Sequence, residues 1–204
     1  MLTTFKNIKA YLKKHPLITT GISAAFNISY ALFHFYLSYI YSSYWYFTLG
    51  MLFLVLGFLR FIVLIVGKNK PLIMLRLLGY VMLFMCVILA GLMHLTISKF
   101  YYPIRSIVFA ISQAAYCFTL MGIAIYHLVD KRKTNNAQLF AISNISFVSA
   151  IFSMLSLERM MLGSFGNSLD SFNQTMEMYT GALSFLLIAW IAFRLLRYKV
   201  KQKF

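Results

Sequence analysis

Long apolar runs separated by short polar or basic connectors dominate this chain. A helix of about 20 apolar residues crosses the roughly 30 Å of hydrocarbon in a bilayer. The apolar positions are continuous, whereas the strands of a membrane barrel alternate apolar and polar residues over about 10 positions. The pattern therefore predicts an all-α polytopic membrane protein that forms a single domain over residues 1–204. Its six predicted transmembrane helices cover about 16–40, 45–67, 72–97, 104–129, 139–157 and 180–196.

Composition agrees with a protein whose main solvent is lipid. Hydrophobic residues make up 61% of the chain and charged residues 11%, and the mean hydropathy is +0.78. Soluble domains average about 25% charged residues. The net charge of +15 would favour a nucleic-acid partner in a soluble protein, but here the basic residues lie at the ends of apolar runs. We therefore expect anionic lipid headgroups, and no nucleic acid, as the partners of this charge.

The basic residues also predict an orientation. Six crossings place both termini on one side, and all of the 19 basic residues except Lys99, Arg105 and Arg159 fall on that side. Loops rich in lysine and arginine stay in the cytoplasm. We expect a multi-pass protein of the cell membrane with cytoplasmic N- and C-termini. Residues 1–15 alternate lysines with apolar residues, which predicts a basic amphipathic segment lying on the membrane surface.

The longest connection between predicted helices is the segment 158–180. It holds Glu158, Asp170 and Glu177, three of the four acidic residues in the chain. Apolar residues recur within it at three- and four-residue spacing, which predicts a short interfacial helix between the fifth and sixth transmembrane helices. The segment is either a lid over a site or a plain connector, and we favour the connector.

Polar residues inside the apolar runs form the first candidate site. Such residues are expected to face the interior of a helical bundle rather than lipid. Asn27, Tyr30 and His34 share one face of their helix, and Gln113 and Tyr116 share a face of another. The fifth predicted helix carries Asn144 and several serines. These residues either hydrogen-bond between helices or line a pathway for a small solute. The pathway candidates are Asn27, Tyr30, His34, Arg60, Gln113, Tyr116 and Asn144.

Arg60 lies about seven residues, or about 10 Å, from the cytoplasmic end of its helix. One interpretation is that its long side chain extends to the interface. The sequence offers no carboxylate at its depth. A buried Arg60 would therefore need carbonyls, tyrosine hydroxyls or an anionic ligand. In the pathway hypothesis Arg60 lies at the cytoplasmic end of the solute pathway and controls entry there.

A second candidate site uses residues that the topology places at the outer side. His34, His94 and Glu158 could together bind zinc, which takes three protein ligands in catalytic sites. The two histidines could instead ligate a haem. No local metal-binding spacing such as HExxH supports either alternative, so no cofactor is predicted.

Several short motifs occur in a fixed order along the chain. They are Asn27 to Tyr30, Ser43 to Tyr46, Leu59 to Phe61, Ala115–Tyr116, Ser153 to Glu158 and Thr180–Gly181. Together these motifs, which are spread over most of the chain, resemble those of an uncharacterised group of six-helix membrane proteins from Gram-positive bacteria. The resemblance implies a lineage but no activity. That group usually has an amide where this chain has Glu158, so the resemblance implies no role for the carboxylate.

The leading functional hypothesis is a small-solute transport or channel-like protein, or an accessory subunit of one. A membrane-embedded metal enzyme at the His34, His94 and Glu158 group is the first alternative. An interaction or immunity-type membrane protein, with a protein partner or a second copy of the chain and no small-molecule site, is the other. Because the chain lacks nucleotide-binding and hydrolase motifs, the sequence favours a protein that is not an enzyme.

Overall fold

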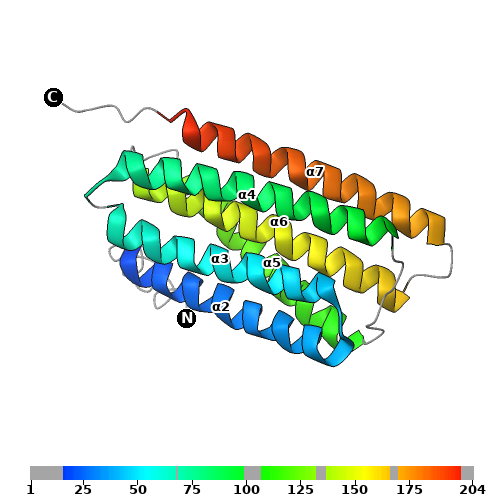
Figure 1. The fold of residues 1–204 in the computed structure, drawn as a ribbon. Coiled ribbons are helices and arrows are strands. Elements are labelled where there is room, and N and C mark those ends of the chain that lie inside the picture. Colours follow the sequence, from blue (N-terminus) through cyan, green and yellow to red (C-terminus); the bar gives the residue numbers. More distant parts are fainter. Residues whose placement is uncertain (1–15, 68, 99–106, 132–136, 166–169, 199–204) are drawn as a thin grey trace.

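A computed structural model describes residues 16–67, 69–98, 107–131, 137–165 and 170–198, and over this part of the chain all regular structure is helical (Figure 1). This confirms the all-α prediction. The predicted amphipathic segment 1–15 lies outside the described residues. The helices are α2 (Pro16–Tyr41), α3 (Tyr44–Val66), α4 (Pro71–Ser98), α5 (Ile107–Lys131), α6 (Ala137–Phe165) and α7 (Asp170–Leu196).

Five stretches are long and apolar enough to cross a membrane, and the chain is a polytopic membrane protein. The described part of α2 has a lower hydropathy because Asn27, Ser29, Tyr30 and His34 interrupt its apolar run, so a sixth crossing stays a prediction. The five stretches are Tyr44–Val66, Pro71–His94, Val108–Ile125, Ala137–Leu162 and Phe172–Leu196.

The prediction for the segment 158–180 was wrong. α6 continues through Glu158 and Arg159 to Phe165, and α7 begins at Asp170 rather than near 180. Most of the segment therefore extends two long helices, and the stretch around Glu177 is part of α7 instead of a separate interfacial helix. The choice between a lid and a connector no longer arises for these residues.

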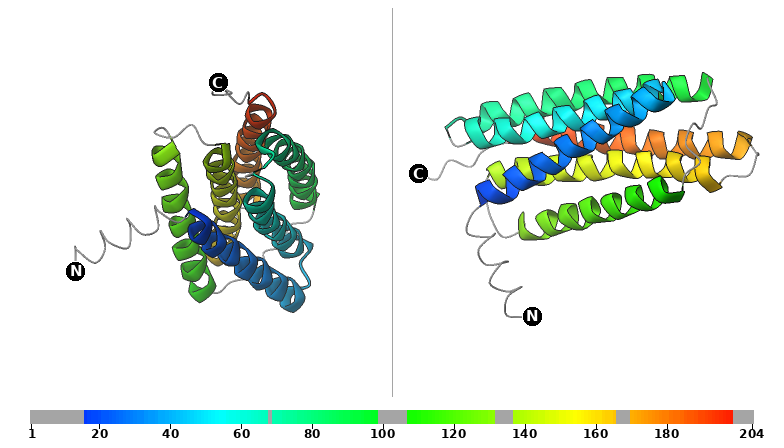
Figure 2. Two further views of the ribbon diagram at one scale, coloured as in Figure 1. Left: turned by 90° about the vertical axis from the view of Figure 1, so that its left-hand side faces the viewer. Right: turned by 90° about the horizontal axis from the view of Figure 1, so that it is seen from below.

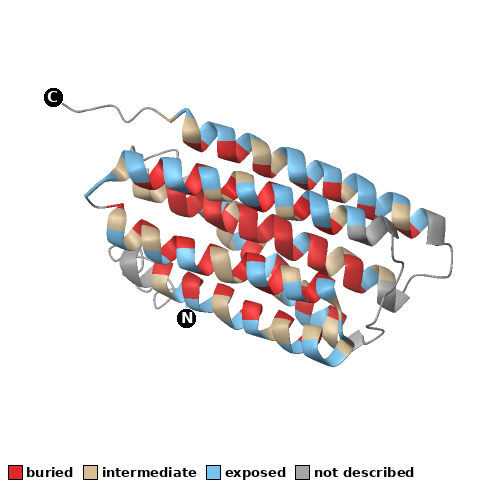
Figure 3. Cartoon of the chain, in the orientation of Figure 1, coloured by how far each residue is buried: buried red, intermediate tan, exposed pale blue. Residues whose placement is uncertain are grey.

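α6 is the central helix of the bundle. It contacts α3, α4, α5 and α7, and Figure 2 shows it running between them. In α6, 78% of the apolar stretch that could cross the membrane is buried inside the protein. In α5 only 28% of the corresponding stretch is buried. Buried positions accordingly follow α6 along most of its length (Figure 3). Side chains placed on α6 can therefore meet partners from most of the other helices.

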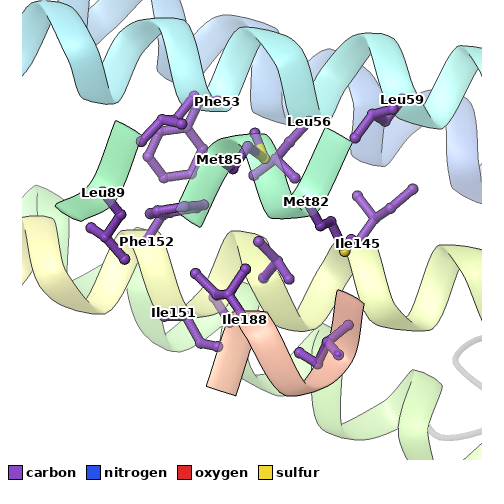
Figure 4. Close-up of a cluster of buried hydrophobic side chains, with 14 of the residues drawn as sticks. Phe53, Leu56, Leu59, Met82, Met85, Leu89, Ile145, Ile151, Phe152 and Ile188 are labelled. Carbon is purple, nitrogen blue, oxygen red and sulfur yellow. The ribbon is translucent and has the colours of Figure 1, made fainter. Parts of the chain in front are cut away.

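The remaining helices associate mainly in pairs, α2 with α3 and α4 with α7, while α5 packs on α6. Gly50 allows the close approach of α2 and α3, since a Cβ atom there would lie 2.8 Å from a ring carbon of Phe35 and 3.2 Å from the carbonyl oxygen of Ala31. A cluster of apolar side chains from α3, α4, α6 and α7 fills the centre of the bundle (Figure 4). Phe53 and Phe152 lie in this cluster and are fully buried.

Candidate functional site: a buried polar seam

A row of serines gives α6 one polar face inside the bundle. Ser146, Ser149, Ser153 and Ser156 are all buried, at alternating three- and four-residue spacing that keeps them on the same side of the helix. The hydroxyls of Ser149 and Ser153 donate to carbonyl oxygens of their own helix, at 3.0 and 2.9 Å. Their oxygen atoms can still accept hydrogen bonds. Side chains of α2, α3 and α5 meet this row, and we call the whole group the polar seam.

α2 contributes two fully buried residues to the polar seam. The amide nitrogen Nδ2 of Asn27 donates to Ser149 Oγ at 3.2 Å. Two turns further along α2, His34 Nε2 and Ser156 Oγ share a hydrogen bond at 3.1 Å. The sequence placed Asn27 and His34 on one face of their helix, and this face lies against α6.

α5 joins the polar seam through Gln113. The hydroxyl of Tyr30 donates to Gln113 Oε1, and Gln113 Nε2 donates to the carbonyl oxygen of Ser153 at 3.3 Å. Tyr30 also stacks on Tyr116, with ring centroids 3.6 Å apart and ring planes 10° from parallel. The side-chain amide of Gln113 thus links α5 to both α2 and α6. The stacked rings of Tyr30 and Tyr116 lie beside this link.

Arg60 of α3 lies inside the polar seam, and its side chain is fully buried. Its Nη1 and Nη2 atoms donate to Ser146 Oγ at 3.3 Å and Ser149 Oγ at 3.4 Å. The expectation that Arg60 reaches the membrane interface was therefore wrong. The guanidinium turns toward the serines of α6, whose hydroxyl oxygens accept its hydrogen bonds inside the bundle.

Asn144 is buried but makes no hydrogen bond to another helix within the part of the chain that the structure describes. Its Nδ2 donates to the carbonyl oxygen of Phe140 in the preceding turn, at 2.7 Å. Side chains that bond back to their own helix are common for asparagine and serine. The structure therefore brings Asn27, Tyr30 and Arg60 together with the residues of α5, and leaves Asn144 outside the interhelical bonds.

Several buried polar atoms of the polar seam have no hydrogen-bond partner among the described residues. They belong to four side chains that come from three helices. A buried polar atom without a partner costs about 1–3 kcal/mol, and native proteins contain few of them. The protein by itself thus leaves this seam incompletely satisfied. The atoms are Asn27 Oδ1, His34 Nδ1, Arg60 Nε and Tyr116 Oη.

The residues of the metal-site hypothesis do not come together. His34 is fully buried, His94 is exposed and Glu158 is half-buried. No group of three His, Cys, Asp or Glu side chains among the described residues could hold a metal ion. Zinc requires its ligands at about 2 Å. A haem held by two histidines requires both to face the same iron. The described residues therefore do not form the zinc site, and the haem alternative stays a prediction.

A buried ion pair lies one helical turn beyond Ser156, the last serine of the polar seam, and the sequence did not predict it. Arg159 of α6 and Glu177 of α7 form a salt bridge of 3.1 Å, and their side chains are only 7% and 5% exposed. The guanidinium of Arg159 lies 4.2 Å from the centre of the Trp45 ring of α3. We call these three residues the Arg159 cluster. Glu158 lies next to it, beside Thr180, and its Oε1 has no partner among the described residues.

The available signal for the Arg159 cluster was one cation, Arg159, and one anion, Glu177, each interrupting an apolar context. Each of these charges alone is costly in a membrane, and together they neutralise one another.

The likeness to six-helix proteins of Gram-positive bacteria stays a prediction. No protein-family model, curated protein or solved structure matches this chain.

Proposed function

We propose that this integral membrane protein is a small-solute transport or channel-like protein whose solute binds in the polar seam. The observation that carries the proposal is the group of buried polar atoms without partners in Asn27, His34, Arg60 and Tyr116. A solute with several hydrogen-bonding groups would satisfy atoms that the protein leaves unpaired. In the structure the polar seam is closed, since Asn27 and Arg60 are fully buried. Passage of a solute therefore requires the helices around the polar seam to separate.

The structure supports this function better than the metal-enzyme alternative. The polar seam draws on α2, α3, α5 and α6, and sites built between helices are usual for ligands of helical bundles. Polar residues that face the interior of a membrane bundle commonly mark solute pathways. The two histidines and the glutamate of the enzyme hypothesis, in contrast, form no metal-binding group among the described residues.

Flux into liposomes tests the proposal. Purified protein in liposomes should raise the entry of at least one of glycerol, urea, potassium chloride or sodium phosphate above that of empty liposomes. Replacing Gln113 with leucine should lower this flux about tenfold, because it removes the bridge from α5 to Tyr30 and Ser153 that shapes the site. Ser112→Ala is the matched control, because Ser112 is exposed and bonds only within α5. Absence of flux for every solute, or equal flux in the Gln113 and Ser112 variants, would contradict the proposal.

We also propose that both termini face the cytoplasm of the cell and that anionic headgroups bind the basic residues there. The excess of lysine and arginine on that side supports this orientation. In Gln202→Cys, a membrane-impermeant maleimide should label the new thiol only after the cells are permeabilised. The two natural cysteines, Cys86 and Cys117, are buried, and alanine at both positions removes any background. Labelling of intact cells would show that the C-terminus is outside.

A further inference from the structure

The hydrogen bonds of Arg60 leave most of its donors unused. A guanidinium carries five N–H groups. One N–H of Nη1 goes to Ser146 and one of Nη2 goes to Ser149. Nε has no acceptor among the described residues, and each terminal nitrogen retains a second N–H. At 3.3 and 3.4 Å the two bonds that do form are also long for a charged donor.

The acceptors nearest to Arg60 are already shared. The hydroxyl of Ser149 donates its own hydrogen to Ile145, and its oxygen accepts from Asn27 as well as from Arg60. A hydroxyl oxygen has two lone pairs, so Ser149 has no capacity left. The hydroxyl of Tyr116 interacts electrostatically with Arg60 and, as a further donor, has no acceptor among the described residues. Arg60 and Tyr116 thus bring unpaired donors to this part of the polar seam, beside the unpaired acceptor Oδ1 of Asn27.

The charge of Arg60 is also uncompensated. No carboxylate among the described side chains forms an ion pair with it, and the buried carboxylate of Glu177 is engaged by Arg159. An ionised group removed from water without a partner carries a large energetic cost. Buried ions in proteins are accordingly paired, or they bind a ligand of opposite charge. Two neutral serine hydroxyls offer hydrogen bonds but no opposite charge.

We propose that the polar seam binds an oxyanion, a carboxylate, phosphate or sulfate group, with the guanidinium of Arg60 as its counter-charge and the hydroxyl of Tyr116 as a further donor. This inference rests on the proposed function and gives the chemical class of its solute. An oxyanion supplies several acceptors and a negative charge together. Guanidinium groups bind such groups through two parallel N–H bonds. The oxyanion belongs to a free solute or to the headgroup of an anionic lipid.

Thermal unfolding in an uncharged detergent tests this inference. At constant ionic strength, sodium phosphate, sodium sulfate or sodium acetate replaces sodium chloride in one arm. In the other arm phosphatidylglycerol replaces phosphatidylcholine in mixed micelles. A ligand that binds only the folded protein raises Tm in a saturable way. We expect such a rise in at least one arm for the natural chain, and the arm identifies a free ion or a lipid headgroup as the source.

Three variants assign the effect to Arg60. Arg60→Gln should lose the rise in Tm, whereas Arg76→Gln should keep it, because Arg76 is exposed on α4. Arg60→Lys retains the charge but not the paired donors, and it should need about tenfold more anion for the same rise. Should Arg60→Gln fail to fold, the Arg60→Lys titration decides: an unchanged midpoint would overturn the inference. No rise in either arm, or an equal rise in Arg60→Gln, would also overturn it.

The flux assay separates this inference from the proposed function. If glycerol or urea enters liposomes in a manner sensitive to Gln113→Leu while no anion raises Tm, the polar seam carries a neutral solute. The proposed transport function would then hold, and the proposal that the polar seam binds an oxyanion would be wrong. If an oxyanion binds through Arg60 and no solute crosses, the site is correct and the transport function is wrong.

Discussion

Replacing Glu177 with glutamine is expected to lower the free energy of unfolding by about 3–5 kcal/mol. The side chain keeps its size and loses its charge, and Arg159 then remains buried without its carboxylate partner. Removal of one partner of a buried ion pair costs far more than removal of both. Trp45 adds a cation–π contact to the guanidinium but cannot replace the negative charge. The pair is almost completely shielded from water, so screening by solvent does not reduce this effect.

Unfolding in mixed micelles with an increasing fraction of denaturing detergent measures this loss. The double variant Glu177→Gln with Arg159→Gln should recover much of the stability, because it leaves no unpaired charge. Glu158→Gln is the matched control: Glu158 is adjacent to Arg159, half-buried and outside the salt bridge, so a change within about 0.5 kcal/mol is expected. Equal losses in the Glu158 and Glu177 variants would show that the salt bridge does not stabilise the bundle.

Replacing Phe53 with alanine should cost about 3 kcal/mol, at the lower end of the range for buried phenylalanines. The ring is fully buried, and its centroid lies 4.7 Å from that of Tyr30, 5.6 Å from that of His34 and 6.5 Å from that of Phe152. Lipid solvates apolar side chains as well as the protein core does, so the loss arises from the cavity and the ring contacts. Because Tyr30 and His34 belong to the polar seam, this cavity should also reduce solute flux.

Phe58 provides a control in the same helix. It is 56% exposed on the surface of α3, so Phe58→Ala should change stability by no more than about 0.5 kcal/mol. Phe53→Leu retains most of the buried volume and should cost less than about 1.5 kcal/mol. The same unfolding assay ranks all three variants. A Phe58→Ala loss as large as that of Phe53→Ala would contradict a packed aromatic centre at Phe53.

Long apolar runs were sufficient to predict four of the helices to within three residues at each end. The segments 16–40, 45–67, 72–97 and 104–129 became α2, α3, α4 and α5. Basic connectors and prolines bound most of these runs, and the polar turn Tyr41 to Tyr44 separates the first two. The prediction worked because each helix satisfies its own backbone hydrogen bonds, so its existence depends on local sequence.

The C-terminal end of α6 and the N-terminal end of α7 could not be predicted in this way, although the start of α6 and the end of α7 were predicted to within two residues. Glu158, Arg159 and Glu177 interrupt the apolar runs, and an isolated charge normally indicates that a helix has left the membrane. The structure places Arg159 against Glu177, and the pair removes the reason for the helices to end. Such pairing is a property of two helices at once, and the sequence of either one does not contain it.

For the polar residues, too, the sequence predicted the local arrangement but not the partners on other helices. Helical spacing placed Asn27, Tyr30 and His34 on one face, and polar residues in an apolar helix were expected to face inward. Spacing did not reveal that the serines of α6 are their common partners. It also did not distinguish Arg60, which is buried, from an arginine that extends to the interface, or buried His34 from exposed His94.

By itself the sequence determined that this chain is a bundle of membrane helices with polar side chains in its interior. Those properties follow from hydropathy and from the requirement that backbone groups in lipid bond within their own helix. Only the tertiary structure decided which polar groups meet. The packing of α2, α3 and α5 around α6 gathers Arg60, Tyr116 and the serines, and packing depends on the shapes of all the helices together. The proposed anion site is therefore a product of tertiary structure, built from residues that the sequence shows only as separate exceptions to an apolar pattern.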